Sequence, residues 1–130
     1  NFGQANYGAA KLGLVGLINT LAIEGAKYNI KANALAPIAA TRMTEDILTE
    51  ELLAKFDPTW VAPVMAHLCT DELDESGQVY IVGGGNVHAV RWYKSAGADF
   101  ETQPTLDDVA AKCATINDFT NAQASRNPAG

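Results

Sequence analysis

The sequence is poor in cysteine and in clustered positive charge. Its two cysteines, Cys69 and Cys113, lie far apart, so neither a zinc ribbon nor a disulfide framework is indicated. The nine Lys and Arg residues are scattered and outnumbered by fifteen Asp and Glu, whereas phosphate binding needs clustered cations. We therefore expect no nucleic-acid partner. Two free thiols suit a reducing compartment, and we predict a cytoplasmic location.

Long apolar runs are also missing. Asn19, Glu24 and Lys27 interrupt the most apolar stretch, so no uninterrupted run reaches the ~18–20 residues of a transmembrane helix. No signal peptide is visible, and no membrane partner is expected. A composition with 48% hydrophobic and 18% charged residues is typical of a globular domain. Because the sequence opens at Asn1 and runs straight into a helical pattern, we expect it to be part of a longer protein.

A long helix is predicted over residues 5–26, with Gly25 as its stop signal. One stripe along this helix carries the aliphatic residues Leu14, Leu17, Ile18 and Leu21. A second stripe carries the small residues Ala9, Gly13 and Gly16. A helix with so little polar surface is expected to pack on two sides. Because an exposed apolar patch of this size is rare on monomers, we predict a homo-oligomer formed through this helix.

The other expected elements follow the chain in a helix and strand alternation. The expected strands are 31–36, ended by Pro37, and 78–82, with an extended segment at 87–93 and a loop DELDESG before the second strand. The expected helices are one capped by Thr44 that runs to about Phe56, one with Asp57 as cap and Pro58 as first residue that runs to about Thr70, and one that begins with a capping box Thr-x-x-Asp at Thr105 and runs to about Asn121. The tail QASRNPAG shows no pattern. Helices separated by buried strands predict an α/β domain with a parallel sheet.

Tyr7 and Lys11 are the first candidates for chemistry. They stand four apart near the start of the long helix, which puts both side chains on one face. A nearby ammonium favours the ionised phenol, so the pair could take a proton from an alcohol while hydride leaves to a nicotinamide ring. On spacing alone, the alternative is a chance pair on a helix surface.

The context of the pair resembles the short-chain dehydrogenase/reductase family. The pair is followed by a small-residue helix, then KANALAP, then Thr41-Arg42-Met43, then a strand that ends in glycines, in the order that this family shows. Within the family, NFGQANYGAAKLGLVGLINTLAIEGAKYNIKANALAP, TRMT and WVAPVMAHLC look like the (3R)-hydroxyacyl-CoA dehydrogenase modules of the peroxisomal multifunctional enzyme type 2 subgroup and their bacterial relatives. Residues 1–86 would then be the C-terminal part of the dehydrogenase core, and 87–130 a C-terminal extension with a helix.

The resemblance implies a role for each candidate residue. Tyr7 would be the general acid/base, and Lys11 would hold the nicotinamide ribose and stabilise the ionised Tyr7. Pro37 and Ile38 would lie along the nicotinamide, with the Ile38 backbone and the Thr41 hydroxyl near its carboxamide. The cofactor would be NAD or NADP, with NAD favoured, and the substrate a small molecule, possibly an acyl-CoA. A peroxisomal location becomes the alternative to a cytoplasmic one.

The sequence departs from the family pattern at two places. Ile38 replaces the usual glycine after the proline, and Thr41 follows Pro37 by four residues where most members place it five after. The family's glycine-rich dinucleotide loop, its catalytic Ser and its helix Asn fall outside these residues. The fold class is therefore expected to be the C-terminal part of a Rossmann-like parallel sheet flanked by helices, lacking the N-terminal dinucleotide-binding half, and this chain alone is expected to be inactive.

Two other functions stay open at this point, namely a non-catalytic assembly element and an unrelated small binding domain that imitates the motif. Other motifs are weaker. Gly83, Gly84 and Gly85 are interpreted as a strand exit rather than a phosphate loop. His67 and Cys69 stand two apart on a predicted helix and diverge, so no metal site is predicted.

Overall fold

A computed structural model describes residues 2–40 and 49–125 of the chain. It divides into two compact units, Asn1–Val90 and Arg91–Gly130, which are described separately. The division comes a few residues after the boundary predicted at 86 and 87, because strand β3 (Asn86–Val90) pairs with the strand before it and so belongs to the first unit.

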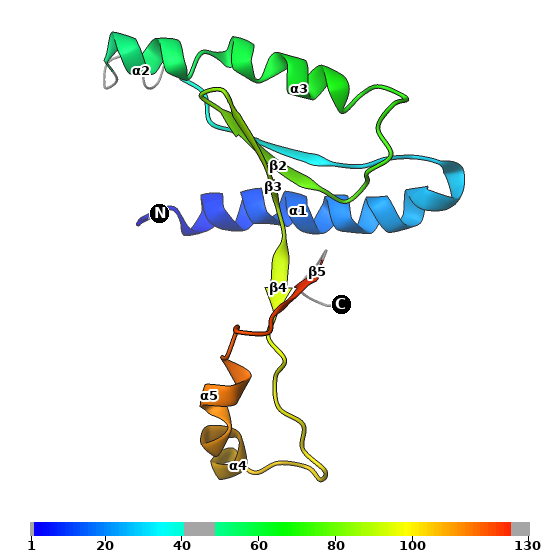
Figure 1. The fold of residues 1–130 in the computed structure, drawn as a ribbon, viewed down its shortest axis with the longest axis vertical. Coiled ribbons are helices and arrows are strands. Elements are labelled where there is room, and N and C mark those ends of the chain that lie inside the picture. The colour runs from blue at the N-terminus through cyan, green and yellow to red at the C-terminus, as the bar shows by residue number, and fades with distance from the viewer. Residues whose placement is uncertain (1, 41–48, 126–130) are drawn as a thin grey trace. The chain divides into compact units, whose positions relative to one another are not determined.

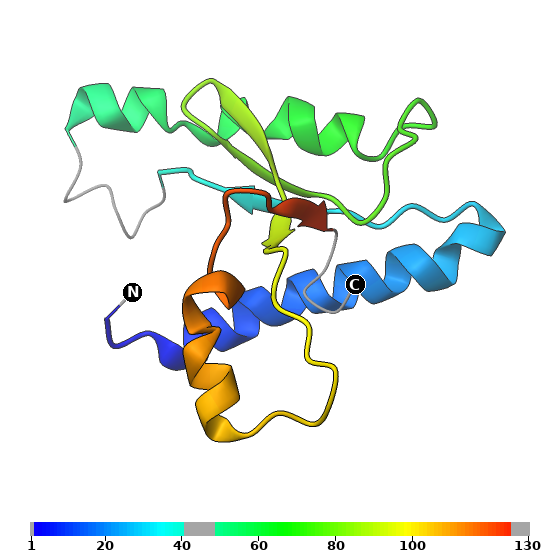
Figure 2. The same ribbon diagram turned by 60° about the horizontal axis from the view of Figure 1, so that its bottom comes forward.

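The first unit contains a mixed sheet between helices (Figure 1). Its elements are α1 (Ala5–Gly25), the 3₁₀ helix η1 (Ala26–Tyr28), β1 (Ala34–Pro37), α2 (Glu50–Lys55), the 3₁₀ helix η2 (Pro58–Trp60), α3 (Ala62–His67), β2 (Val79–Gly83) and β3. The sheet order is β1-β2-β3. Figures 1 and 2 both show α1 on one side of the sheet, and α2 with α3 on the other.

The parallel pairing predicted for the first two strands is confirmed. β1 and β2 run parallel, with Ala34 opposite Val79 and Pro37 opposite Val82. The strands lie far apart in sequence, and a parallel pair requires such a long crossover connection. β1 begins three residues later than expected and includes Pro37, which lies at its carboxyl end.

The glycine cluster, which the sequence indicated as a strand exit, forms the turn of a hairpin. β2 and β3 pair antiparallel from Val79 opposite Val90 to Gly83 opposite Asn86, so Gly84 and Gly85 are the two-residue loop of a hairpin. Their φ angles of 58° and 79° lie in the left-handed region, as a type I′ turn requires at both positions. Glycine adopts this region without the steric cost that a Cβ imposes.

The helices after β1 are shorter than predicted. The proposed cap Thr44 lies outside the described residues, and α2 begins at Glu50 with the Thr49 hydroxyl accepting from the Leu52 N–H. Asp57 does cap the next segment, as predicted, but η2 and α3 replace one continuous helix. Pro63 has no N–H to bond the fourth carbonyl before it, which is one reason why the first turn does not continue as an α-helix.

Helix α1 has the predicted limits and is almost entirely exposed within this chain. Leu14 is 50% and Leu17 51% exposed, and the buried positions of the helix are Asn19 and Gly25. By length and composition, Ala5–Tyr28 could cross a membrane, a test that core helices of soluble proteins also pass. The small and aliphatic residues outweigh the three polar interruptions in the average hydropathy, so the expectation of no membrane partner stays a prediction.

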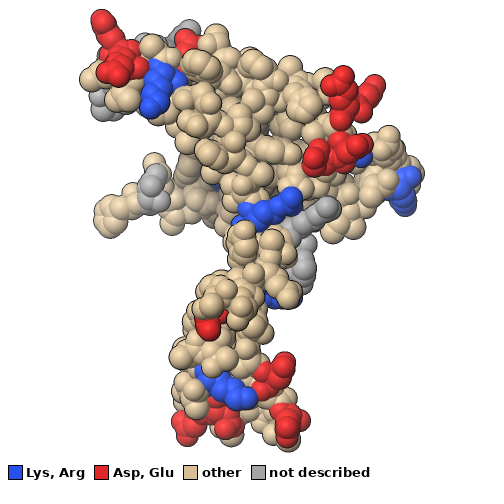
Figure 3. Space-filling view, in the orientation of Figure 1, with Lys and Arg blue, Asp and Glu red and all other residues tan. Residues whose placement is uncertain are grey.

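The charged side chains of the first unit gather away from the sheet. Figure 3 shows Asp and Glu at α2 and in the loop that follows α3, while most of the visible face between them is uncharged. The acidic residues of these two segments are Glu50 and Glu51, and Asp71, Glu72, Asp74 and Glu75. The acidic side chains therefore mark two separate segments of the unit, one at α2 and one after α3.

The second unit is a two-stranded sheet with two short helices. It contains β4 (Trp92–Lys94), α4 (Leu106–Ala111), α5 (Cys113–Ile116) and β5 (Gln123–Ser125), with β4 and β5 antiparallel. The capping box predicted at Thr105 is confirmed, since Thr105 and Asp108 bond reciprocally. The helix breaks at Lys112 and ends at Ile116, before the predicted Asn121. The expectation of an unstructured tail is wrong for residues 123–125, which pair with β4, and residues 126–130 lie outside the described residues.

Candidate active site

Tyr7 and Lys11 lie on the exposed first turns of α1. The prediction that they share one helix and one side is confirmed, because the Lys11 Nζ lies over the Tyr7 ring, 5.5 Å from its centroid. An ammonium at this distance is attracted to the face of the ring, by about 0.5–1 kcal/mol at exposed sites. The Tyr7 side chain is 56% exposed. Both groups can therefore be reached by a ligand that approaches this face of the helix.

Pro37 and Ile38 lie where β1 ends. The Ile38 N–H donates to the Val82 carbonyl at 2.7 Å, which extends the parallel ladder one residue beyond Pro37. The Ile38 side chain is 53% exposed and presents apolar surface at this end of the sheet. Two residues on, the Ala40 N–H donates to the Phe56 carbonyl at 2.7 Å. The chain leaving β1 is thus held by β2 and by the end of α2.

The two groups of candidates lie at the same end of the first unit. α1 and β1 run in opposite directions, so the first turns of the helix and the carboxyl end of the strand come to one end in both Figures 1 and 2. The structure therefore brings Tyr7 and Lys11 to the end of the sheet that carries Pro37 and Ile38. The fifth candidate, Thr41, lies outside the described residues.

Comparison with known proteins shows which family the chain belongs to. The sequence profile of the short chain dehydrogenase family matches residues 1–52. A short-chain type dehydrogenase/reductase of Mycobacterium tuberculosis is 63% identical over 95% of this chain, and the peroxisomal multifunctional enzyme type 2 of Mus musculus is 47% identical over 94%. The full-length structure of peroxisomal multifunctional enzyme type 2 from Drosophila melanogaster matches 95% of the chain with a TM-score of 0.82 and 33% identity.

The chain belongs to the short-chain dehydrogenase/reductase family. This family is one of oxidoreductases, and the α/β class with a Rossmann-like sheet is confirmed by the structural match. The third possibility, an unrelated binding domain, is excluded. The chain spans 43% of the mycobacterial relative, 17% of the mouse enzyme and 23% of the Drosophila chain.

One residue that the sequence predicted only as part of a strand exit lies beside these candidates. Gly83, the last residue of β2, approaches the Ile38 backbone so closely that a Cβ there would overlap the Ile38 carbonyl oxygen. The signal in the sequence was the Gly-Gly pair directly after it, between two runs of strand-forming residues, which is typical of a tight hairpin. Recognising that hairpin would have placed Gly83 inside a paired strand rather than at a strand exit.

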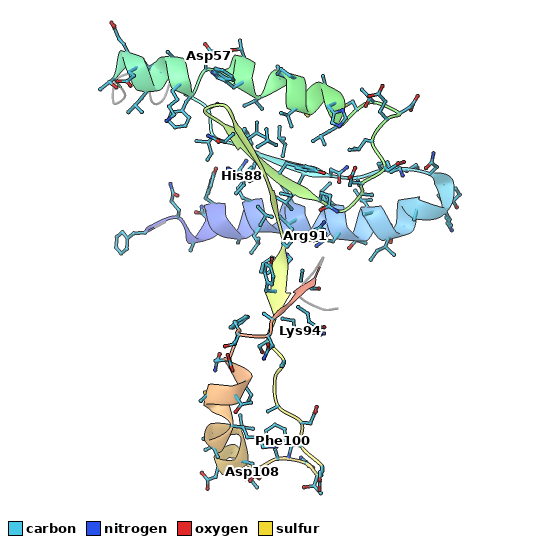
Figure 4. The ribbon with its side chains drawn as sticks, in the orientation of Figure 1. Asp57, His88, Arg91, Lys94, Phe100 and Asp108 are labelled. Carbon is cyan, nitrogen blue, oxygen red and sulfur yellow. The ribbon has the colours of Figure 1, made fainter. Side chains whose placement is uncertain are left out.

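The carboxylates with lowered pKa values serve the fold of the chain rather than the candidate site. Hydrogen bonds from Thr59 to Asp57, from Thr105 to Asp108 and from Thr120 to Asp118 lower the pKa of each carboxyl below its usual value. Figure 4 shows Asp57 at the start of the segment that leads into α3, and Asp108 in α4. Within residues 2–40 and 49–125, no group of three or more His, Cys, Asp or Glu could hold a metal ion.

Proposed function

We propose that this chain carries the proton-transfer residues and the nicotinamide-facing residues of an oxidoreductase active site. Tyr7 is the general acid/base, and Lys11, whose ammonium lies over the Tyr7 ring, binds ribose hydroxyls. The observation that carries the proposal is the exposed Tyr7 and Lys11 pair on α1, at the end of the sheet where β1 stops. A positioned acid/base contributes typically ~10²–10⁴-fold to such a reaction.

The described residues fit the nicotinamide end of a dinucleotide. NAD or NADP, with NAD favoured, would supply hydride acceptance or donation when bound. Lys11 offers an exposed ammonium for hydroxyl groups, and Pro37 and Ile38 offer exposed apolar surface for a flat ring. The Ile38 N–H is already bonded to Val82, so we assign Ile38 a contact through its side chain. Thr41 is proposed to approach the carboxamide, as the family pattern implies.

The substrate that we propose is an alcohol or ketone, with 3-hydroxyacyl-CoA preferred. This preference is supported by the likeness to the multifunctional enzymes, whose hydratase-dehydrogenase relatives extend to fungi. Several relatives are named as peroxisomal, which supports a peroxisomal location, whereas the mycobacterial relative is compatible with the cytoplasmic one.

The 130-residue chain alone is proposed to be inactive. Positioning of the reactants supplies several kcal/mol of the rate enhancement, and Lys11, Pro37 and Ile38 would contact only one end of the cofactor. Too few contacts then remain to offset the entropy of capturing a dinucleotide. We expect isothermal titration of NAD and NADP into this chain to show no binding at micromolar concentration. Micromolar affinity would contradict this part of the proposal.

The catalytic assignment is tested in a longer protein that contains this chain and a glycine-rich dinucleotide segment before it. Turnover of 3-hydroxyacyl-CoA with NAD or NADP is measured for the wild type, Tyr7→Phe and the control Tyr28→Phe. Tyr28 is also an exposed tyrosine but lies on η1, at the far end of α1, so its hydroxyl should not matter. We expect kcat to fall by about 10²–10⁴-fold in Tyr7→Phe alone. Undiminished turnover would refute the role of Tyr7.

A second candidate function is a non-catalytic assembly element. The observation that favours it is the exposed aliphatic surface of α1, which nothing within the described chain covers. Both functions predict association through α1. They differ in the longer protein, because an assembly element would show no nicotinamide-dependent activity although Tyr7 and Lys11 are intact.

A further inference from the structure

Gly83 ends β2 beside the backbone of Ile38, the residue that follows β1. A Cβ built on Gly83 would overlap the Ile38 carbonyl oxygen and lie 2.9 Å from the Ile38 Cβ and 3.1 Å from its carbonyl carbon. The Ile38 carbonyl oxygen and carbon are backbone atoms, and they cannot rotate away from the added methyl group as the end of a side chain can. The ladder therefore continues past Pro37 to the Ile38 N–H bond with Val82 only because residue 83 has no side chain.

The surrounding structure prevents Gly83 from moving away from Ile38. Gly83 pairs with Asn86 of β3, on the other side of β2. The hairpin tip that follows is covered by the end of α2, since a Cβ on Gly84 would lie 3.2 Å from Cε1 of Phe56. β2 is thus paired along both edges, whereas past Pro37 Ile38 is joined to it through its N–H bond to Val82, so an added methyl group would displace Ile38 rather than β2.

We propose that Gly83 is a positioning residue that fixes the Ile38 backbone, and with it the surface for the nicotinamide ring, an inference that rests on the proposed function. Replacing Gly83 with alanine separates β1 from β2 after Pro37 and breaks the Ile38 N–H bond. The nicotinamide end of the cofactor then loses its support. The adenosine end, which none of these residues contacts, is unaffected.

The test uses two ligands in the longer protein that contains this chain. NAD has the nicotinamide ring, whereas ADP-ribose lacks it, and binding of each is measured by isothermal titration alongside KM for NAD and kcat. The control is Gly25→Ala, whose Cβ would lie 2.9 Å from the Ile30 carbonyl oxygen at the opposite end of α1. This control adds the same methyl group against backbone but lies away from the site.

We expect Gly83→Ala to weaken NAD binding and raise KM for NAD by about tenfold or more, with ADP-ribose binding unchanged. Gly25→Ala should affect both ligands equally or neither. A loss of both ligands in Gly83→Ala, or wild-type affinity for NAD, would overturn the inference.

Ile38→Pro provides a second variant, should Gly83→Ala fail to fold. It removes the N–H that bonds Val82, and it is compared with Ile38→Ala, because both variants lose the side chain assigned to the ring but only the proline variant loses the N–H. We expect Ile38→Pro to bind NAD more weakly than Ile38→Ala does, with ADP-ribose binding unchanged in both. Equal NAD affinity in the two variants would also overturn the inference. If the wild type binds neither ligand and shows no turnover, the proposed function itself fails, and this inference with it.

Discussion

The hairpin glycines allow the contribution of a turn to stability to be measured against a matched control. Gly85 has a φ angle of 79°, and a Cβ there would meet only Cζ3 of Trp60, at 3.8 Å. Space is therefore not limiting, and the cost of Gly85→Ala comes from the left-handed backbone, about 1–2 kcal/mol. Gly8 lies in α1 with no atom near an added Cβ, so Gly8→Ala should stabilise the helix by about 0.5–1 kcal/mol.

The same chemical change should thus shift stability in opposite directions. With a urea m value of about 2 kcal/mol per M, the unfolding midpoint of Gly85→Ala should fall by about 0.5–1 M and that of Gly8→Ala should rise by about 0.25–0.5 M. Fluorescence can report the transition of the first unit in a Trp92→Phe background, which leaves Trp60 beside the hairpin tip.

The reasoning would be refuted if Gly85→Ala were neutral or stabilising, since a turn that tolerates a Cβ there cannot have the positive φ that the hairpin requires. A destabilising Gly8→Ala would show instead that α1 is packed against something at that position. Equal losses in both variants would mean that the effect reflects the substitution and not the backbone conformation.

Three further predictions concern association, a helix cap and pH. The wild-type chain should form dimers or larger assemblies at micromolar concentration through α1, and Leu17→Lys should shift light scattering toward the monomer, whereas a stable wild-type monomer would contradict this. In the second unit, Thr105→Ala should lower the free energy of unfolding by about 1 kcal/mol, because it removes the N-cap of α4. Hydrogen bonds from the Thr105 hydroxyl and N–H lower the pKa of Asp108 in the folded state. The carboxylate therefore stabilises α4 at pH values above the pKa of unfolded Asp, ~3.9, and this stabilisation is lost as the pH falls through the lower pKa of the folded state. Circular dichroism from pH 6 to pH 2 should show this loss, and Asp108→Asn should remove its pH dependence.

Local chemistry made several elements predictable from the sequence. α1 follows from a long run of helix-compatible residues, and the caps at Asp57 and Thr105 from bonds that span two or three residues. Helix limits were predicted less well where the outcome depended on a single backbone group. Apolar spacing alone predicts one helix as far as residue 70. Because Pro63 lacks an N–H, this segment is divided into η2 and α3.

The order of motifs along the chain determined the family and the candidate pair Tyr7 and Lys11, because helical spacing alone puts both on one face. Only the tertiary structure decided that this face and the carboxyl end of β1 occupy one end of the sheet. It also decided that β5 pairs with β4, and that Gly83 must lack a side chain beside Ile38. The physical reason is that strand pairing and close backbone approach join residues distant in sequence, so no local pattern of side chains specifies them.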